Sequence, residues 1–401
     1  MTNCSATGTI SLTGTIGGGL LGLVIYGTVT DCYANVTVEG NAYVGGLIGE
    51  IRNDSVISGC YATGNVIGRS TLSRAGGLVG YIADGTTLTD CYATGDVTGV
   101  QQIGGLVGTI IDPAFTALTN CYATGDVSGS ASRIGGLVGY YQGGDVDNCY
   151  ATGNVSGTDQ VGGLFGYIEN TGSNAATVKN SRAFGTVNGN NNVGGLIGDA
   201  WSYLGRSSVT VEICYAAGDV SGNQSVGGLI GNVTANYIPP PGGKSVLVKD
   251  CFATGDVTGT DWYAGGLVGY LNGANPASIE NCYATGTVSG SAVGGIVGGT
   301  SGSATVKDCA AFNASVTNTY AGRIVGYATG TPTFSNNVAW DGMSGTFSHS
   351  YSDDGADITA AAIRADGTIS GHFTGAGNWT TANGKLPGLF GNTVDMPAWL
   401  Q

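Results

Sequence analysis

Residues 91–108 read CYATGDVTGVQQIGGLVG and contain the two blocks from which most of the chain is built. The first block, Cys-Tyr-Ala-Thr-Gly-Asp-Val, alternates small apolar and polar residues, as a half-buried strand does. The second block, Gly-Gly-Leu-Val-Gly, places two apolar residues between glycines. Glycine interrupts both blocks too often for a helix, and Val, Thr and Tyr favour strands. Each unit therefore predicts short strands.

The second block recurs along most of the chain, at intervals of 27 to 38 residues. Its regular copies are residues 45–49, 76–80, 104–108, 135–139, 162–166, 194–198, 227–231, 265–269 and 294–298. A first copy at 18–22 and a last copy at 322–326 deviate, as terminal repeats usually do. The recurrence indicates a repeat protein.

Each unit is too short to bury its own apolar face, so neighbouring units must stack. We predict an all-β fold, a parallel β-solenoid (β-helix) of about eleven coils with two or three strands each, forming a rod roughly 50 Å long. Leu and Val of the second block should fill the lumen from one wall, and Cys, Ala and Val of the first block from the other. We expect the Gly pairs to supply positive-φ corners and close backbone approach.

The ten Cys occur once per repeat and never as a close pair: Cys4, Cys32, Cys60, Cys91, Cys121, Cys149, Cys214, Cys251, Cys282 and Cys309. Stacked neighbours lie about 4.8 Å apart with parallel side chains, whereas a disulfide needs Cβ atoms about 3.8 Å apart and turned toward each other. We therefore predict a column of reduced, lumenal thiols, in which Ser181 substitutes for one Cys.

Composition limits the class of protein. With 42% hydrophobic residues the chain can bury a core despite its 75 Gly. The net charge of −14, with only 13 basic residues, argues against nucleic acid as a partner. No apolar run is long enough for membrane insertion. The apolar stretch 17–25 aligns with later repeats, so we expect no export signal within this chain.

Two parts are predicted, a solenoid at 1–330 and a C-terminal capping segment at 331–401. The second part has aromatic residues that most repeats lack: Trp340, Phe347, Phe373, Trp379, Phe390 and Trp399. We expect it to cover the last coil, with a short helix at 357–365 that has Asp357 near its N-terminus. Insertions lengthen loops at 69–73, 201–208 and 237–244, the last containing a rigid proline-rich spur at 238–243.

The alternating blocks resemble the GLUG repeats of bacterial surface and secreted proteins, over about residues 3–330. The residues 322–326, 335–337 and 384–387 resemble the segment that often closes such arrays. The resemblance implies an extracellular or cell-surface location. Such arrays occur in adhesin-like chains and beside the catalytic domain of some immunoglobulin A-specific metallopeptidases, and they fix no ligand.

Nothing in the sequence predicts catalysis or a cofactor. The chain has no His-Glu-x-x-His motif, and His349 and His372 lack Cys or Glu partners at ligand spacing. Asp353 and Asp354 are interpreted as a solvated turn. Polysaccharide-acting β-helix enzymes gather carboxylates and basic residues in a cleft, whereas the Lys and Arg here are few and scattered.

Two columns of Asp and Asn are predicted on the corners of the coils. One follows the Thr-Gly corner: Asn65, Asp96, Asp126, Asn154, Asp219 and Asp256. The other precedes Cys: Asp31, Asp90, Asn120, Asn148, Asn180, Asp250, Asn281 and Asp308. Calcium could bridge stacked carboxylates. Hydrogen bonds from turn amides explain the mixture of Asp and Asn better, so no metal site is predicted.

The alternation that turns Cys and Ala inward turns Tyr and Thr outward. The candidate binding face is the ladder Tyr61, Thr63, Tyr92, Thr94, Tyr122, Thr124, Tyr150, Thr152, Tyr283 and Thr285. It could stack on sugar rings, pack against another rod or a protein, or fit ice, although Arg182 and Ala310 interrupt the column. The simplest interpretation is that stacked Tyr and Thr stabilise the sheet.

We therefore predict a non-catalytic extracellular structural rod, acting as a stalk, adhesin segment or self-assembling filament subunit of a bacterial surface. The alternative is a glycan-binding module that uses the Tyr/Thr face; ice binding and a polysaccharide-acting enzyme rank lower. The first block begins at residues 3–8, and nothing in the sequence shields the edge of that coil. We expect a second copy to dock there head-to-tail, unless a preceding domain covers the edge.

Overall fold

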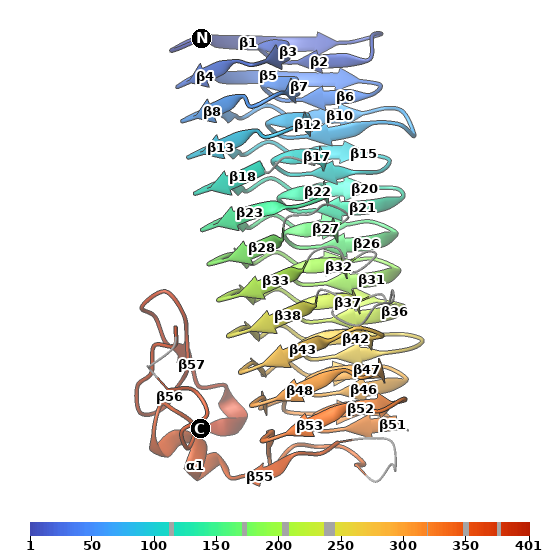
Figure 1. The fold of residues 1–401 in the computed structure, drawn as a ribbon, viewed down its shortest axis with the longest axis vertical. Coiled ribbons are helices and arrows are strands. Elements are labelled where there is room, and N and C mark those ends of the chain that lie inside the picture. Colours follow the sequence, from blue (N-terminus) through green and yellow to red (C-terminus); the bar gives the residue numbers. More distant parts are fainter. Residues whose placement is uncertain are drawn as a thin grey trace.

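A computed structural model shows one long parallel β-solenoid with a small C-terminal cap (Figure 1). It describes residues 1–111, 116–170, 175–202, 208–235, 245–318, 320–347, 353–374 and 378–401. Over these residues, sheet I has 22 strands and sheets II, III and IV have 11 each. Sheet I runs from β1 (Ser5–Ser11) to β55 (Ala356–Ile358), and sheet II from β2 (Ile16–Gly18) to β51 (Tyr320–Gly322). Sheet III runs from β3 (Leu21–Ile25) to β52 (Val325–Ala328), and sheet IV from β4 (Thr28–Thr30) to β53 (Thr333–Ser335).

One coil contains five short strands, rather than the two or three predicted. They are β14 (Tyr92–Ala93) and β15 (Val97–Gly99) in sheet I, β16 (Ile103–Gly104) in sheet II, β17 (Val107–Ile111) in sheet III and β18 (Thr116–Thr119) in sheet IV. Corners at Gly and Asx positions interrupt the strands more often than the block pattern suggested. Equivalent residues pair from coil to coil, for example Tyr92 with Tyr122 and Ala93 with Ala123. This in-register stacking confirms the predicted solenoid.

The lumen is filled as the repeat predicts. Leu106 and Val107 enter it from one wall, and Cys91, Ala93 and Val97 from the opposite wall, all buried. Nine of the ten Cys are buried, and Cys4 in the first coil is half-buried. All ten are free thiols in the structure. Ser181 takes the place of a Cys in its coil and donates its hydroxyl to the Lys179 carbonyl, as the thiols do with their own neighbours.

The Gly pairs do not have the positive φ that we expected. A Cβ on Gly45 would lie 1.9 Å from the Ile48 carbonyl oxygen, and one on Gly46 would lie 2.0 Å from that of Gly77. These glycines are therefore required for close backbone approach. Left-handed residues stand instead before Cys, mostly on Asx such as Asp90 (φ 54°) and Asn120 (φ 56°), and two residues before several Gly pairs, as at Arg133 (φ 66°). Short polar side chains tolerate that conformation better than most.

The C-terminal residues form two structural parts. Strand β54 (Val338–Trp340) pairs with β55 and continues sheet I, and Trp340 and Phe347 pack against the lumenal core at the end of the rod. The remainder contains α1 (Ala360–Ala365), the antiparallel pair β56 (Lys385–Leu386) and β57 (Val394–Asp395), and the 3-10 turn η1 (Ala398–Leu400). We call residues 359–401 the side cap.

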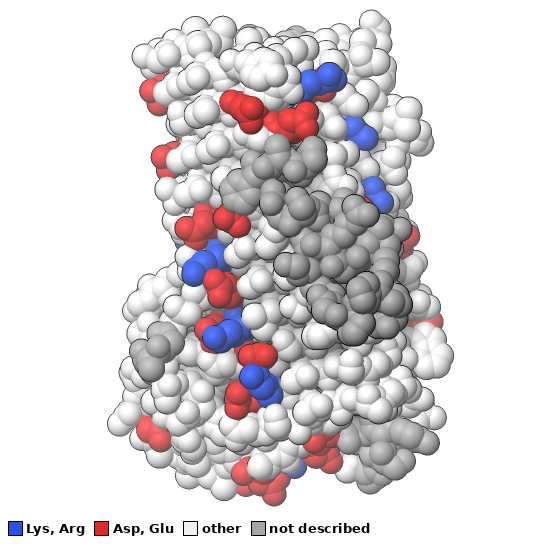
Figure 2. Space-filling model, viewed as in Figure 1, with Lys and Arg blue, Asp and Glu red and all other residues white. Residues whose placement is uncertain are grey.

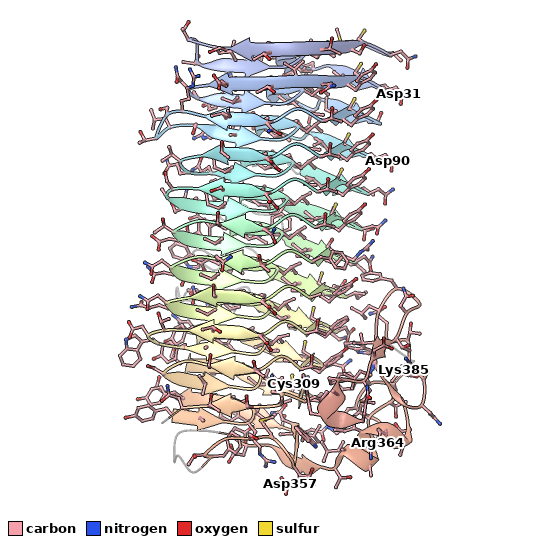
Figure 3. The ribbon with its side chains drawn as sticks, turned by 180° about the vertical axis from the view of Figure 1, so that it is seen from behind. Asp31, Asp90, Cys309, Asp357, Arg364 and Lys385 are labelled. Atoms are coloured by element: carbon pink, nitrogen blue, oxygen red, sulfur yellow. The ribbon has the colours of Figure 1, made fainter. Side chains whose placement is uncertain are left out.

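The side cap lies along the outer face of the last coils, whereas we expected it to cover the end of the rod (Figures 1 and 3). Its apolar residues form a second core with sheet I: Ile363, Ile369, Phe373, Trp379, Leu386, Leu389, Met396 and Leu400. The helix starts later than expected, because Thr359 caps it by accepting a hydrogen bond from the Ala362 N–H (3.1 Å). Asp357 belongs to β55 and pairs with Arg323.

The predicted insertions are only partly visible. Arg69, the first residue of the loop at 69–73, forms an ion pair with Glu39 of the preceding coil. The proline-rich spur at 238–243 and most of the loop at 201–208 lie outside the described residues. No helix in the described part of the chain has the length and apolarity that a membrane crossing requires.

Candidate functional site

The predicted Tyr ladder forms a continuous stack in the upper part of sheet I. Rings of Tyr33, Tyr61, Tyr92, Tyr122 and Tyr150 have centroids 4.8 to 4.9 Å apart and are parallel within 1° to 4°. Beside them, a row of Thr is exposed: Thr63, Thr94, Thr124 and Thr152. We call the five stacked Tyr rings the open ladder. The predicted outward alternation is confirmed here, whereas its role in binding stays a prediction.

The geometry of the open ladder limits how it could bind. Each inner ring has both faces against its neighbours, so solvent meets ring edges and hydroxyl groups. A sugar ring that stacks on an aromatic needs a free face. The stacking mode that the sequence suggested is therefore closed at Tyr61, Tyr92 and Tyr122. Contacts between neighbouring rings, which stabilise the sheet, account for the spacing.

The same column continues downward under the side cap. Tyr215, Phe252 and Tyr283 stack at 4.7 and 5.0 Å, and we call them the covered ladder. Trp379 packs on Phe252 and Tyr283, and Phe373 meets Tyr283 edge-on at 5.6 Å. The Tyr283 hydroxyl donates to the Pro387 carbonyl (2.6 Å).

Tyr283 and Thr285 are therefore wrong as members of an exposed binding face. Both are buried: Thr285 is 4% exposed, and Tyr283 is fully inaccessible to solvent beneath the side cap. The sequence could not show this, because the repeat gives these residues the same pattern as Tyr92 and Thr94.

Arg182 marks the boundary between the two halves of the ladder. It occupies the position of a Tyr, and its guanidinium lies over the Tyr150 ring at 5.0 Å and over the Phe390 ring of the side cap at 5.2 Å. Such cation–π contacts are favourable on an aromatic face. The residue that seemed to interrupt the ladder in fact joins its open end to the cap.

The two Asx columns join neighbouring coils by hydrogen bonds. In the first, the Asp126 N–H donates to Asp96 Oδ1 (2.9 Å), and the Asn154 N–H donates to Asp126 Oδ1 (2.7 Å). In the second, which Figure 3 marks by Asp31 and Asp90, Asn120 Nδ2 donates to Asp90 Oδ1 (2.9 Å). These bonds use the carboxylates as predicted for turn residues. The described residues contain no group of three or more His, Cys, Asp or Glu arranged to hold a metal ion.

A seam between sheets II and III was not predicted from the sequence. It consists of the residue two before each Gly pair and the residue after each Gly-Leu-Val-Gly block, such as Arg133 and Tyr140 in one coil. Arg133 lies over the Tyr140 ring at 4.6 Å and over the Tyr167 ring at 5.1 Å. Tyr140 donates its hydroxyl to Glu169 (2.6 Å). Side chains that vary between repeats fill this corner, which is why the repeat pattern did not reveal it.

Asp199 is the buried centre of this seam. Its carboxylate accepts hydrogen bonds from the side-chain amides of Gln160 (3.1 Å), Asn192 (3.2 Å) and Asn232 (2.8 Å). Burial raises the pKa of Asp199, and the three amides oppose that shift. Three donors on one buried carboxylate form a structural cluster that joins successive coils.

A column of alternating charge on sheet IV was also missed. Pairing places six charged residues in successive coils: Asp147, Lys179, Glu212, Lys249, Glu280 and Lys307. Lys179 contacts Glu212 at 3.0 Å and Lys307 contacts Glu280 at 3.2 Å. Figure 2 shows the red and blue side chains alternating along this face. Three Lys residues that are far apart in the sequence are therefore brought into one column, between acidic neighbours.

The other polar residues considered for catalysis have structural contacts. The His372 ring nitrogens lie 3.2 Å from the Ile369 carbonyl and 3.1 Å from the Asn336 carbonyl. Asp354 accepts a hydrogen bond from the Arg323 N–H (3.0 Å), and Asp353 forms a backbone bridge with Val325. His349 lies outside the described residues.

The comparison with protein families agrees with this repeat geometry. The family described as "The GLUG motif" matches residues 40–67, 71–98, 99–128, 130–156 and 260–289. The chain contains GLUG repeats. Each matched GLUG repeat spans roughly one coil, from the end of one sheet I segment to the next. Neither the curated proteins nor the solved structures include a match to this chain.

Proposed function

We propose that the chain is a non-catalytic extracellular rod, serving as a stalk, adhesin segment or filament subunit of a bacterial surface. GLUG repeats occur in secreted bacterial proteins, which supports the location. The observation that carries the proposal is that the repeated side chains contact one another along the rod. Stacked Tyr rings, Asx carboxylates and alternating charges all contact the next coil.

Side-chain contacts between successive coils suit a stalk that separates two other parts. A stalk needs length and stiffness from a repeated unit, and each coil here adds about 4.8 Å of rise. A catalytic surface instead needs groups whose hydrogen bonds are directed at a ligand. The regular columns of this rod direct theirs along the axis.

The location is tested on intact cells of the source bacterium. Antibodies against the solenoid should label intact cells as strongly as permeabilised ones, while a cytoplasmic marker is labelled only after permeabilisation. Labelling that requires permeabilisation would overturn the extracellular part. The non-catalytic part is tested by incubating the purified chain with polysaccharides and peptides; turnover of any of them would contradict it.

The proposed role as a filament subunit requires a second copy of the chain as partner. Apolar side chains of the first coil are exposed, including Leu23 (44%), Ile25 (48%) and Tyr26 (74%). Thr9→Lys on the free edge of β1 should abolish self-association in light scattering. A wild-type chain that stays monomeric at high concentration would remove the filament role and leave the stalk and adhesin roles.

A further inference from the structure

A second aromatic surface lies at the corner between sheets I and II near the C-terminal end, beside the labels β46 and β51 in Figure 1. Trp262 is 55% exposed and Tyr320 is 43% exposed. Together with Asp261, Ser291, Ala292 and Asn318 they line a cavity of about 230 Å³. Large exposed aromatics beside a cavity are a frequent feature of binding sites.

Three successive coils build this cavity. The upper wall comes from the loop between β40 (Val257–Gly259) and β41 (Ala264–Gly265), which holds Trp262. The lower wall is Tyr320 at the start of β51, and in the coil between them Ala292 pairs in register with Tyr320. The backbones of the two outer coils are two strand spacings, about 10 Å, apart, and the small side chains of the middle coil leave space between the walls.

The repeat itself does not require a Trp at this position. Trp262 stands two residues before Ala264, as Gln224 stands two residues before Val226, and Ala264 pairs with Val226. The earlier coils have only short or polar side chains in this column: Ser132, Asp159, Asn191 and Gln224. Trp262 therefore replaces a polar residue with an exposed indole, which adds nothing to the lumen.

The loop that holds Trp262 is fixed before any ligand arrives. The Thr260 and Asp261 N–H groups each donate to the coil above, to Gly222 and Asn223, at 3.0 Å. The Thr260 hydroxyl donates to Asn223 Oδ1 (2.7 Å), and Gln224 Nε2 donates to Asp261 Oδ2 (3.0 Å). A wall that is already ordered loses little entropy on binding.

We propose that this cavity binds one unit of a neutral saccharide. The indole face attracts the C–H face of a sugar ring, because the face of an aromatic ring is electron-rich. Around it, the Asp261 carboxylate and the Ser291 hydroxyl match the hydroxyl groups at a sugar's edge, whereas the Asn318 side-chain amide donates to the Gly290 carbonyl and forms part of the wall. The volume is below the roughly 300–1,000 Å³ of drug-sized pockets, which suits a single ring.

Charge selects against acidic sugars. None of the described residues that line the cavity is basic, and Asp261 is acidic. The whole chain has a net charge of −14. An anionic saccharide would meet repulsion both locally and at long range.

Calorimetric titration with short fragments of cellulose, starch, chitin, mannan and xylan tests the proposal, with a fragment of polygalacturonate as acidic comparison. We expect saturable binding of at least one neutral fragment and weaker binding of the acidic one. Trp262→Gln restores the residue type of the neighbouring coil and should weaken binding about tenfold or more while thermal unfolding is unchanged. Tyr26→Gln, at an aromatic of the first coil that is 74% exposed, is the matched control and should bind the fragments normally.

Three results would overturn the proposal. They are the absence of saturable binding to every neutral fragment at millimolar concentrations, unchanged affinity in Trp262→Gln, and preference for the acidic fragment. None of them bears on the rod, whose location and lack of turnover are measured separately.

Discussion

The open ladder and the covered ladder have the same sequence pattern and opposite environments. Tyr92 stacks on its neighbours and remains partly exposed, whereas Tyr283 stacks in the same way and is completely buried. The difference comes from residues 359–401, which belong to no repeat. A repeated column is therefore a potential interface at every coil, and a non-repetitive segment decides where it becomes one.

The largest expected difference between the two halves is in stability. Tyr283→Ala should lower the free energy of unfolding by about 3–5 kcal/mol, because it empties a buried site between Phe373 and Trp379. Tyr92→Ala should cost about 1 kcal/mol, since it removes mainly neighbour stacking. Chemical denaturation of both variants measures the difference, and equal losses would show that the side cap does not bury Tyr283.

Alkaline titration separates the halves by pKa. Burial raises the pKa of Tyr283 strongly and that of Tyr92 less, so the native state holds the Tyr283 proton more tightly than the unfolded chain does. This stabilisation is complete below about pH 10, the unfolded value, and is lost as the pH rises above it.

Ultraviolet difference spectra of wild type and Tyr283→Phe should show that Tyr283 ionises only when the protein unfolds. Tyr92→Phe should instead remove a component that titrates reversibly in the folded protein. Reversible ionisation of Tyr283 without unfolding would contradict its burial.

The Tyr283 hydroxyl offers a smaller test of the same contact. Tyr283→Phe leaves the buried Pro387 carbonyl without this donor and should cost about 1 kcal/mol. Tyr92→Phe serves as the control and should change stability by less than half as much. If both substitutions are neutral, the hydrogen bond to the side cap is absent in solution.

Arg182 tests the boundary and should give the smallest effect. Arg182→Ala removes the contacts with Tyr150 and Phe390 and should cost about 0.5–1 kcal/mol. Limited proteolysis should then cut the side cap near Phe390 sooner than in wild type, with Arg69→Ala as the control in a distant loop. Unchanged proteolysis of the cap would show that Arg182 does not hold it.

The sequence predicted what the repeat controls. It predicted the parallel stack, the lumenal Cys column and the outward Tyr, because residues 91–108 set their alternation and every coil repeats it. It did not predict the seam around Asp199 or the charge column, because those side chains vary between coils and become neighbours only through register.

The position of the side cap was also beyond the sequence. Trp379 and Phe373 indicated an apolar segment. Tertiary packing alone determines that this segment lies on the outer face of sheet I and not over the end of the rod. The Gly pairs were misjudged for a related reason. Their φ depends on how closely the next coil approaches, which the sequence of one coil does not contain.

Counting reactive thiols tests the continuous solenoid most directly, because the Cys column has nearly one member in each coil. Nine of the ten thiols are buried in the lumen, so a reagent cannot reach them while the coils stay stacked. In the native protein we expect reaction of Cys4 at most, the only Cys that is not fully buried, and of all ten in denaturant. Rapid reaction of several native thiols, or a count far below ten after denaturation without reductant, would contradict the lumenal column and the stack that encloses it.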